Sequence, residues 1–209
     1  MDLLGILSFV FVVFLTILWW GLYDAANPPG DAERDPFSSL VMSGLFVGGI
    51  APVPLGTPPP SLDTVLQRIR AAGGYGAVDD FLDGARRAYE LIVVAVARGD
   101  LHGVAHLLTD EVSKDFQAYI DARRERGEAE TLTFIGFQGA DIVAASLGGV
   151  ASVDVRFSAE LASVTRDREG GLVEGSANRI VRVAEIWTFE RNMTSRKPLW
   201  RLAATDADE

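Results

Sequence analysis

The sequence contains no cysteine. This absence excludes structural disulfides, thiolate chemistry and zinc sites built on cysteine. It does not place the chain in a compartment, because a disulfide-free domain can lie on either side of a bacterial inner membrane.

Basic residues are also scarce. The 209 residues include 19 Lys and Arg against 29 Asp and Glu, which gives a formal net charge of −10. Proteins that bind nucleic acid neutralise phosphates with clustered cations, so this composition argues against a nucleic-acid partner.

Residues that could carry metal or acid–base chemistry are few. The only two histidines, His102 and His106, lie four apart on one face of a predicted helix, a spacing that suits two metal ligands. However, Gly103 follows His102 where a metalloprotease helix has a glutamate. We therefore expect surface or packing histidines and no metal site.

Isomerase-type chemistry needs an aspartate base and a donor in a buried pocket. Tyr89 and Asp154 are conceivable candidates, but Tyr89 lies in an apolar stripe and Asp154 on the polar face of its strand. We predict a non-enzymatic protein that needs no cofactor and no obligatory small molecule. A small-molecule-binding or isomerase-type pocket is a remote alternative.

Hydrophobic residues make up 48% of the chain and concentrate near its start. The stretch from Leu3 to Leu22 carries no charge, and about twenty residues of helix rise about 30 Å, the thickness of the bilayer core. We predict a transmembrane anchor over residues 1–23 and a lipid bilayer as a partner. Its candidate lipid-facing and interfacial residues are Leu3, Phe9, Phe11, Phe14, Trp19, Trp20 and Tyr23.

A cleaved signal peptide is the alternative for this segment. It would need a basic start and a shorter apolar run, whereas only Met1 and Asp2 precede this long one. We therefore predict a single-pass protein of the inner (cytoplasmic) membrane. Arg34, the one cation close to the span, slightly favours a cytoplasmic location for the soluble domain.

Residues 24–60 are rich in proline and glycine and form a predicted linker. It contains an apolar strip, residues 40–50, which is too short to span a membrane. The strip either folds back on the domain or contacts the bilayer or a partner. The candidate partner-contact residues are Leu40, Val41, Met42, Leu45, Phe46, Val47 and Ile50.

Residues 61–209 form the predicted soluble domain, which begins with helices. An amphipathic pattern predicts a helix over residues 61–70, capped by Ser61 or Asp63. A longer apolar stripe over residues 81–96 predicts a second helix that Asp79 or Asp80 caps and Gly99 ends. Two further helices are expected over residues 100–108 and 110–126.

The hydrophobic period changes to two after Gly127. Alternation predicts strands over residues 131–137, 142–147, 150–162, 180–190 and 199–205, with residues 166–178 forming a wide hairpin. Helices followed by an antiparallel meander indicate an α+β fold, in which the helices cover one concave face of a curved sheet.

Several runs of residues resemble one family. They are 81–90, 98–100, 153–157, 165–167, 173–175, 185–191, 198–202 and 204–205, all in one register over residues 78–206. The chain resembles the Tim44-like domain family in these runs, above all in Trp187-Thr188-Phe189-Glu190-Arg191. The resemblance implies a cone-shaped fold, similar to nuclear transport factor 2, with a pocket at its wide end.

The resemblance also implies a role. The mitochondrial member of the family anchors the protein-import motor at the inner membrane and contacts a chaperone and the membrane, and bacterial relatives look like membrane-anchored adaptors. The linker of this chain is acidic, apolar and proline-rich, whereas bacterial relatives usually have basic residues there. This difference favours another, dedicated partner.

Four smaller predictions concern the soluble domain. Trp187 is expected in the core with Trp200 beside it. Glu190 and Arg191 are expected to form structural ion pairs. The cluster from Arg123 to Arg126 is expected at a solvated helix end, with contact to anionic lipid as the alternative.

Two functions remain open. The first is a non-enzymatic adaptor or scaffold whose domain binds protein partners at the membrane. The second is a permanent accessory or assembly subunit of a larger integral-membrane complex, which the strip 40–50 and the anchor would contact. In both cases we expect an integral-membrane protein as a partner.

Overall fold

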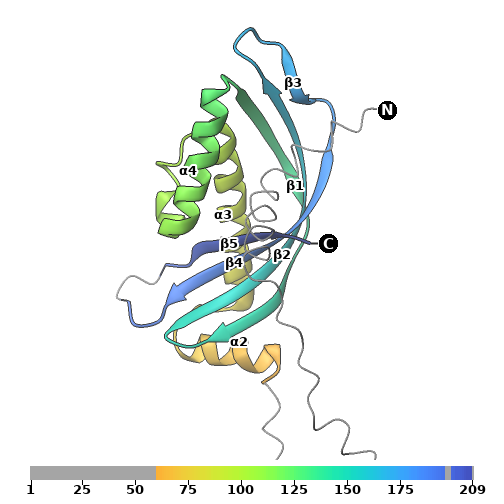
Figure 1. Ribbon diagram of the computed structural model, residues 1–209. Coiled ribbons are helices and arrows are strands. Elements are labelled where there is room, and N and C mark those ends of the chain that lie inside the picture. Colours follow the sequence, from red (N-terminus) through yellow and green to blue (C-terminus); the bar gives the residue numbers. More distant parts are fainter. Residues whose placement is uncertain (1–59, 196–198, 209) are drawn as a thin grey trace, which may run out of the picture.

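The computed structural model of the chain describes residues 60–195 and 199–208 (Figure 1). The predicted anchor and the strip 40–50 lie outside the described residues. Within those residues, no helix is both long and apolar enough to cross a membrane.

The first two helices begin close to their predicted positions. Helix α2 (Leu62–Ala71) is capped by Ser61, whose hydroxyl accepts the backbone N–H of Thr64 at 3.3 Å. Helix α3 (Val78–Arg98) begins after Ala77. Of the two aspartates predicted to cap this start, Asp80 does so from the first turn, where its carboxylate accepts the N–H of Ala77 at 3.3 Å.

Gly99 ends α3 in the left-handed conformation, with φ of 72°, as its position predicted. The segment that follows is not the expected helix over 100–108. Asp100 accepts the backbone N–H of His102 at 3.0 Å and forms a turn, so that only the short 3₁₀ helix η2 (Ala105–Leu107) remains. Helix α4 (Asp110–Glu125) is then capped by Thr109 rather than by Asp110.

The sheet is an antiparallel meander of β1 (Ala129–Leu147), β2 (Val150–Arg166), β4 (Val181–Asn192) and β5 (Arg201–Ala207), in that spatial order. The prediction of two strands over 131–147 was wrong, because β1 is continuous. Its pairing with β2 skips one residue at each of three points, Ile135, Gln138 and Val143. Such bulges keep a strand paired while bending it, and they curve this sheet.

The predicted hairpin after β2 contains a strand of its own. Strand β3 (Leu172–Gly175) pairs with the end of β2, where Val164 lies opposite Gly175. Gly175 has φ of 76°, and a Cβ there would lie 2.2 Å from the carbonyl oxygen of Ser163. The close approach of the two strands therefore requires glycine.

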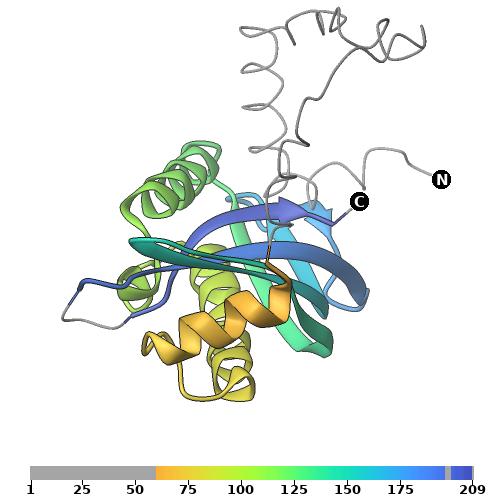
Figure 2. The same ribbon diagram turned by 90° about the horizontal axis from the view of Figure 1, so that it is seen from below.

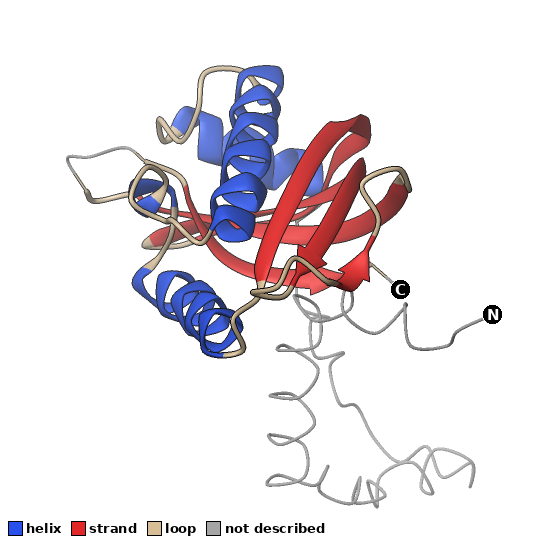
Figure 3. Ribbon diagram, turned by 90° about the horizontal axis from the view of Figure 1, so that it is seen from above, coloured by secondary structure: helices blue, strands red, loops and turns tan. Residues whose placement is uncertain are grey.

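The helices lie on one side of the curved sheet (Figures 1 and 3). Helices α3 and α4 cover its concave face, and α2 packs beneath them against the end near the β1–β2 hairpin (Figures 1 and 2). The largest fully buried side chains come from both layers and are Tyr89, Phe157, Ile69, Ile92, Leu108, Ile120, Leu202, Val153 and Val155. The predicted α+β architecture is confirmed for the described residues.

The two tryptophans of the domain lie apart. Trp187 is in the core, 3% exposed, as predicted. Trp200 does not pack beside it but contacts Phe81, with ring centroids 5.0 Å apart. The strand register gives the reason. Arg201 pairs with Glu190 and Thr205 with Trp187, so Trp200 lies near the Asn192 end of β4, away from Trp187.

Candidate functional site: an apolar cavity on the concave face

A cavity of about 70 Å³ lies between the helices and the sheet. It is partly open to solvent, and all its walls belong to secondary structure. Helices α3 and α4 and strands β1, β2, β4 and β5 contribute Tyr89, Ile92, Val93, Val96, Ala97, Phe116, Tyr119, Glu130, Leu132, Leu161, Glu185, Trp187 and Thr205. Most of these side chains are apolar, which makes the two glutamates the exceptional residues.

Glu185 reaches the cavity because of strand alternation. The inward-facing row of β4 contains Val183, Glu185, Trp187, Phe189 and Arg191, since side chains two residues apart share a face. The carboxylate therefore occupies a position that the neighbouring residues fill with apolar side chains.

Two donors hold one oxygen of this carboxylate. Tyr89 Oη and Trp187 Nε1 both donate to Glu185 Oε2, each at 3.1 Å. Burial raises the pKa of Glu185, and the two hydrogen bonds oppose that rise only in part.

Tyr89 connects α3 to the aromatic core. It is 1% exposed, and its ring centroid lies 4.4 Å from that of Trp187 and 4.9 Å from that of Phe157. Burial, followed by the nearby carboxylate of Glu185, raises the pKa of the Tyr89 phenol. The phenol therefore keeps its proton and remains a donor at physiological pH.

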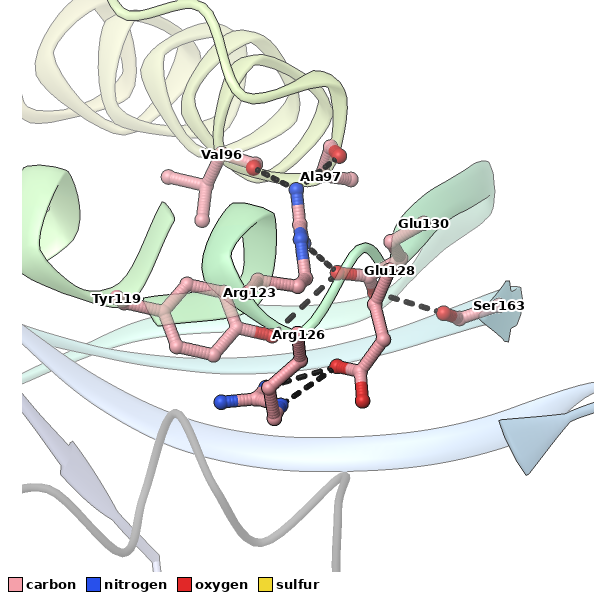
Figure 4. Close-up of polar contacts among 8 residues, drawn as sticks. All are labelled: Val96, Ala97, Tyr119, Arg123, Arg126, Glu128, Glu130 and Ser163. Atoms are coloured by element: carbon pink, nitrogen blue, oxygen red, sulfur yellow. Dashed lines mark hydrogen bonds and ion pairs between the residues drawn. The ribbon is translucent and has the colours of Figure 1, made fainter. Parts of the chain in front are cut away.

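The second carboxylate, Glu130, has a different environment (Figure 4). Ser163 Oγ donates to Glu130 Oε1 at 2.7 Å, and Arg123 Nη1 and Tyr119 Oη donate to Glu130 Oε2. Both oxygens are thus occupied and the charge is neutralised by Arg123.

Arg123 itself is buried, at 5% exposure, between the ends of the two long helices. Its Nη2 donates to the carbonyl oxygens of Val96 and Ala97 in the last turn of α3, at 3.0 Å for Val96 (Figure 4). The C-terminal carbonyls of a helix lack partners within the helix, so this cation satisfies them and complements the helix dipole. The prediction of a solvated arginine cluster was wrong for this residue.

The structure separates the residue pairs that the sequence suggested for chemistry. His102 lies in an exposed turn and His106 in η2, so no helix face carries both. Within the described part of the chain, no three His, Cys, Asp or Glu side chains are grouped as metal ligands would be. Asp154 lies on the opposite face of the sheet from Tyr89, whose carboxylate partner is Glu185 instead.

The contacts of Arg191 differ from prediction, and the place of Glu185 in the cavity was not predicted. Arg191 donates from Nη1 to the carbonyl oxygen of Gly74, and among the described residues it does not form the expected ion pair. Sequence reasoning also missed Glu185 as a cavity residue. The signal was present, because Glu185 and Arg191 share the parity of Trp187 in β4.

No curated protein matches the chain. Among solved structures it is similar to the intermembrane space region of the chloroplast protein ARC6, with 11% identity, a TM-score of 0.42 and coverage of 60% of this chain and 95% of that one.

The chain matches the model of one protein family. The model of the Tim44-like domain matches residues 62–207, which include every helix and strand described above. The chain therefore belongs to the Tim44-like domain family.

Proposed function

We propose that this protein is a non-enzymatic, membrane-anchored adaptor whose Tim44-like domain binds a protein partner at the inner membrane. The observation that carries the proposal is the apolar cavity on the concave face of a domain from this family. The uncharged stretch from Leu3 to Leu22 supports an anchor, and Arg34 supports a cytoplasmic domain.

The size and lining of the cavity favour a protein partner over a small-molecule ligand. Pockets that enclose drug-sized ligands measure roughly 300–1,000 Å³. A cavity of about 70 Å³ instead suits one side chain of a docked protein. Apolar pockets at protein interfaces receive such anchoring side chains.

A permanent accessory or assembly subunit of an integral-membrane complex is the second candidate. The apolar strip 40–50 favours it, because a run of apolar residues within a linker is typical of an interaction site. In this case the anchor and the strip, rather than the cavity, would contact the partner.

A pocket enzyme is a more remote candidate. The hydrogen bond from Tyr89 to Glu185 places an acid and a carboxylate together beside the cavity. Such a pair occurs in proton-transfer sites, but it also occurs in buried polar clusters that are purely structural.

A comparative pull-down in mild detergent tests these proposals. The full-length protein is compared with a shortened chain that begins at Ser61 and retains the entire described core. Recovery of the same membrane protein by both chains supports the adaptor. Recovery by the full-length chain alone supports the accessory subunit. If neither chain recovers a protein partner, both proposals are wrong.

Carbonate extraction of membranes tests the anchor separately. We expect the full-length protein to stay in the membrane fraction and a chain lacking residues 1–23 to be released. Release of both chains would contradict the anchor.

A further inference from the structure

The two glutamates of the cavity differ in how their oxygens are used. Both oxygens of Glu130 accept hydrogen bonds, and Arg123 supplies a compensating charge. At Glu185, both donors point to Oε2. Among the described residues, Oε1 of Glu185 has no hydrogen-bond partner and no cation pairs with this carboxylate.

This arrangement leaves one acceptor unused inside an apolar cavity. Water reaches Oε1 through the open side of the cavity, because this oxygen is not fully buried. A ligand that brings a donor replaces that water and forms a charge-assisted hydrogen bond beside apolar walls, where such a bond is stronger than in bulk water.

We propose that the cavity receives a lysine side chain of the protein partner, with its ammonium group on Glu185 Oε1 and its alkyl stem against the apolar wall. The inference rests on the proposed adaptor function, and it specifies the residue of the partner that the cavity recognises.

The lining favours a cation over a neutral donor. The aromatic rings of Tyr89, Phe116, Tyr119 and Trp187 line the cavity. Aromatic faces attract cations, and the attraction grows when water is excluded. The net charge of −10 also draws basic partners towards the protein.

The geometry of Glu185 favours lysine over arginine. The planar guanidinium group of arginine binds best to two free carboxylate oxygens, whereas ammonium is a point charge that needs one. Glu185 offers only Oε1. The apolar residues Ile92, Val96 and Leu132 provide the contact surface for a four-carbon stem.

The test uses matched probes on the full-length protein in detergent micelles. Nα-acetyl-lysine N-methylamide is compared with the norleucine analogue, which has a similar stem but no charge, and with the arginine analogue. The protein is labelled with ¹⁵N-tryptophan, and the indole N–H signal of Trp187, identified with Trp187→Phe, reports binding next to Glu185.

We expect a saturable shift of the Trp187 signal with the lysine probe, and weaker binding of the norleucine and arginine probes by about tenfold or more. Glu185→Gln keeps an acceptor for Tyr89 and Trp187 but removes the charge, and it should abolish the preference for lysine. Glu160→Gln removes a carboxylate that pairs with Arg182 outside the cavity and should retain the preference.

Three outcomes would overturn the inference: no shift with any probe, equal or tighter binding of norleucine or arginine, or an unchanged lysine preference in Glu185→Gln.

Pull-downs with wild type and Glu185→Gln separate this inference from the proposed function. Equal recovery of one partner by both proteins would preserve the adaptor and refute the lysine site. Lysine binding without any recovered partner would refute the adaptor alone.

Discussion

The indole nitrogen of Trp200 donates a hydrogen bond to the carbonyl oxygen of Gly74 across 2.9 Å. This contact joins the segment before the last strand to the turn between α2 and α3. Arg191 donates to the same carbonyl oxygen. One backbone group in a short turn therefore holds the ends of two strands.

Substitution of Gly74 tests this turn. A Cβ at Gly74 would lie 2.3 Å from Ile69 Cγ2 and 2.9 Å from the carbonyl oxygen of Ile69, which is fully buried. We expect Gly74→Ala to lower the free energy of unfolding by about 1–3 kcal/mol through overpacking. Urea unfolding, followed by tryptophan fluorescence, measures the change.

Gly84→Ala is the matched control for that experiment. Gly84 lies within α3, and apart from its chain neighbours and its own helix backbone no described atom lies within 4 Å of an added Cβ. This variant should gain about 0.5–1 kcal/mol, because alanine is the better helix former. A loss of similar size in both variants would show that Gly74 is not specially constrained.

The buried cation provides a second prediction. Arg123→Met leaves Glu130 without its charge partner and removes a donor from two carbonyls of α3, of which that of Val96 still accepts the N–H of Gly99. We expect a loss of about 3–5 kcal/mol in the free energy of unfolding. Arg182→Met removes the exposed pair with Glu160 and should cost at most about 1 kcal/mol. Similar losses for the two variants would contradict the role given to Arg123.

The pH dependence of stability follows from Glu185. Its pKa in the folded protein is raised by burial, so the folded state favours the protonated carboxyl. The associated stability is fully present below the ordinary glutamate pKa of about 4.3 and is lost as the pH rises through the folded-state pKa.

Glu185→Gln has no such loss, so its stability relative to wild type should increase as the pH rises from about 4. The other titratable groups that line the cavity are Tyr89, Tyr119 and Glu130, and both tyrosines have raised pKa values. Urea unfolding at several pH values measures the difference. Thr205→Val changes the same cavity without a titratable group and should show a constant difference from wild type.

The first of the three bulges in β1, at Ile135, gives a fourth prediction. Ile135 has no partner in β2 at this bulge, and its side chain is exposed. Its neighbour Phe134 packs against Phe137, with the two ring centroids 4.9 Å apart. We expect Phe134→Ala to cost roughly 2–3 kcal/mol, below the value for a fully buried ring. Ile135→Thr should change stability by less than about 0.5 kcal/mol. The reverse order would mean that the register is shifted by one residue.

The sequence predicted those elements whose signals are local. The three-four spacing from Phe81 to Val96 and the alternation from Val150 to Ala162 predicted α3 and β2, and the position of Gly99 predicted the helix end. The break assumed inside 131–147 was wrong because bulges disturb the alternation of β1 without ending its pairing.

The candidate site was less predictable because it depends on contacts between distant residues. The parity of Glu185 in β4 was readable, but its pairing with Tyr89 depends on how α3 lies on the sheet. Arg123 looked like one of several surface cations. It is buried because α3, α4 and β1 pack around it, and there it contacts both the Val96 carbonyl of α3 and the Glu130 carboxylate of β1.

The position of β5 has a consequence for folding. Leu202 in this last strand is fully buried, and its carbonyl oxygen accepts the N–H of Thr109 at 2.9 Å. Thr109 therefore contacts a residue that is synthesised almost a hundred positions later. Contacts between residues so far apart in sequence raise the contact order of a domain, and domains of high contact order fold slowly. During synthesis the apolar sides of α3 and α4 stay uncovered until the strands of the sheet, β5 last, have left the ribosome, and the nascent domain is then most prone to aggregate.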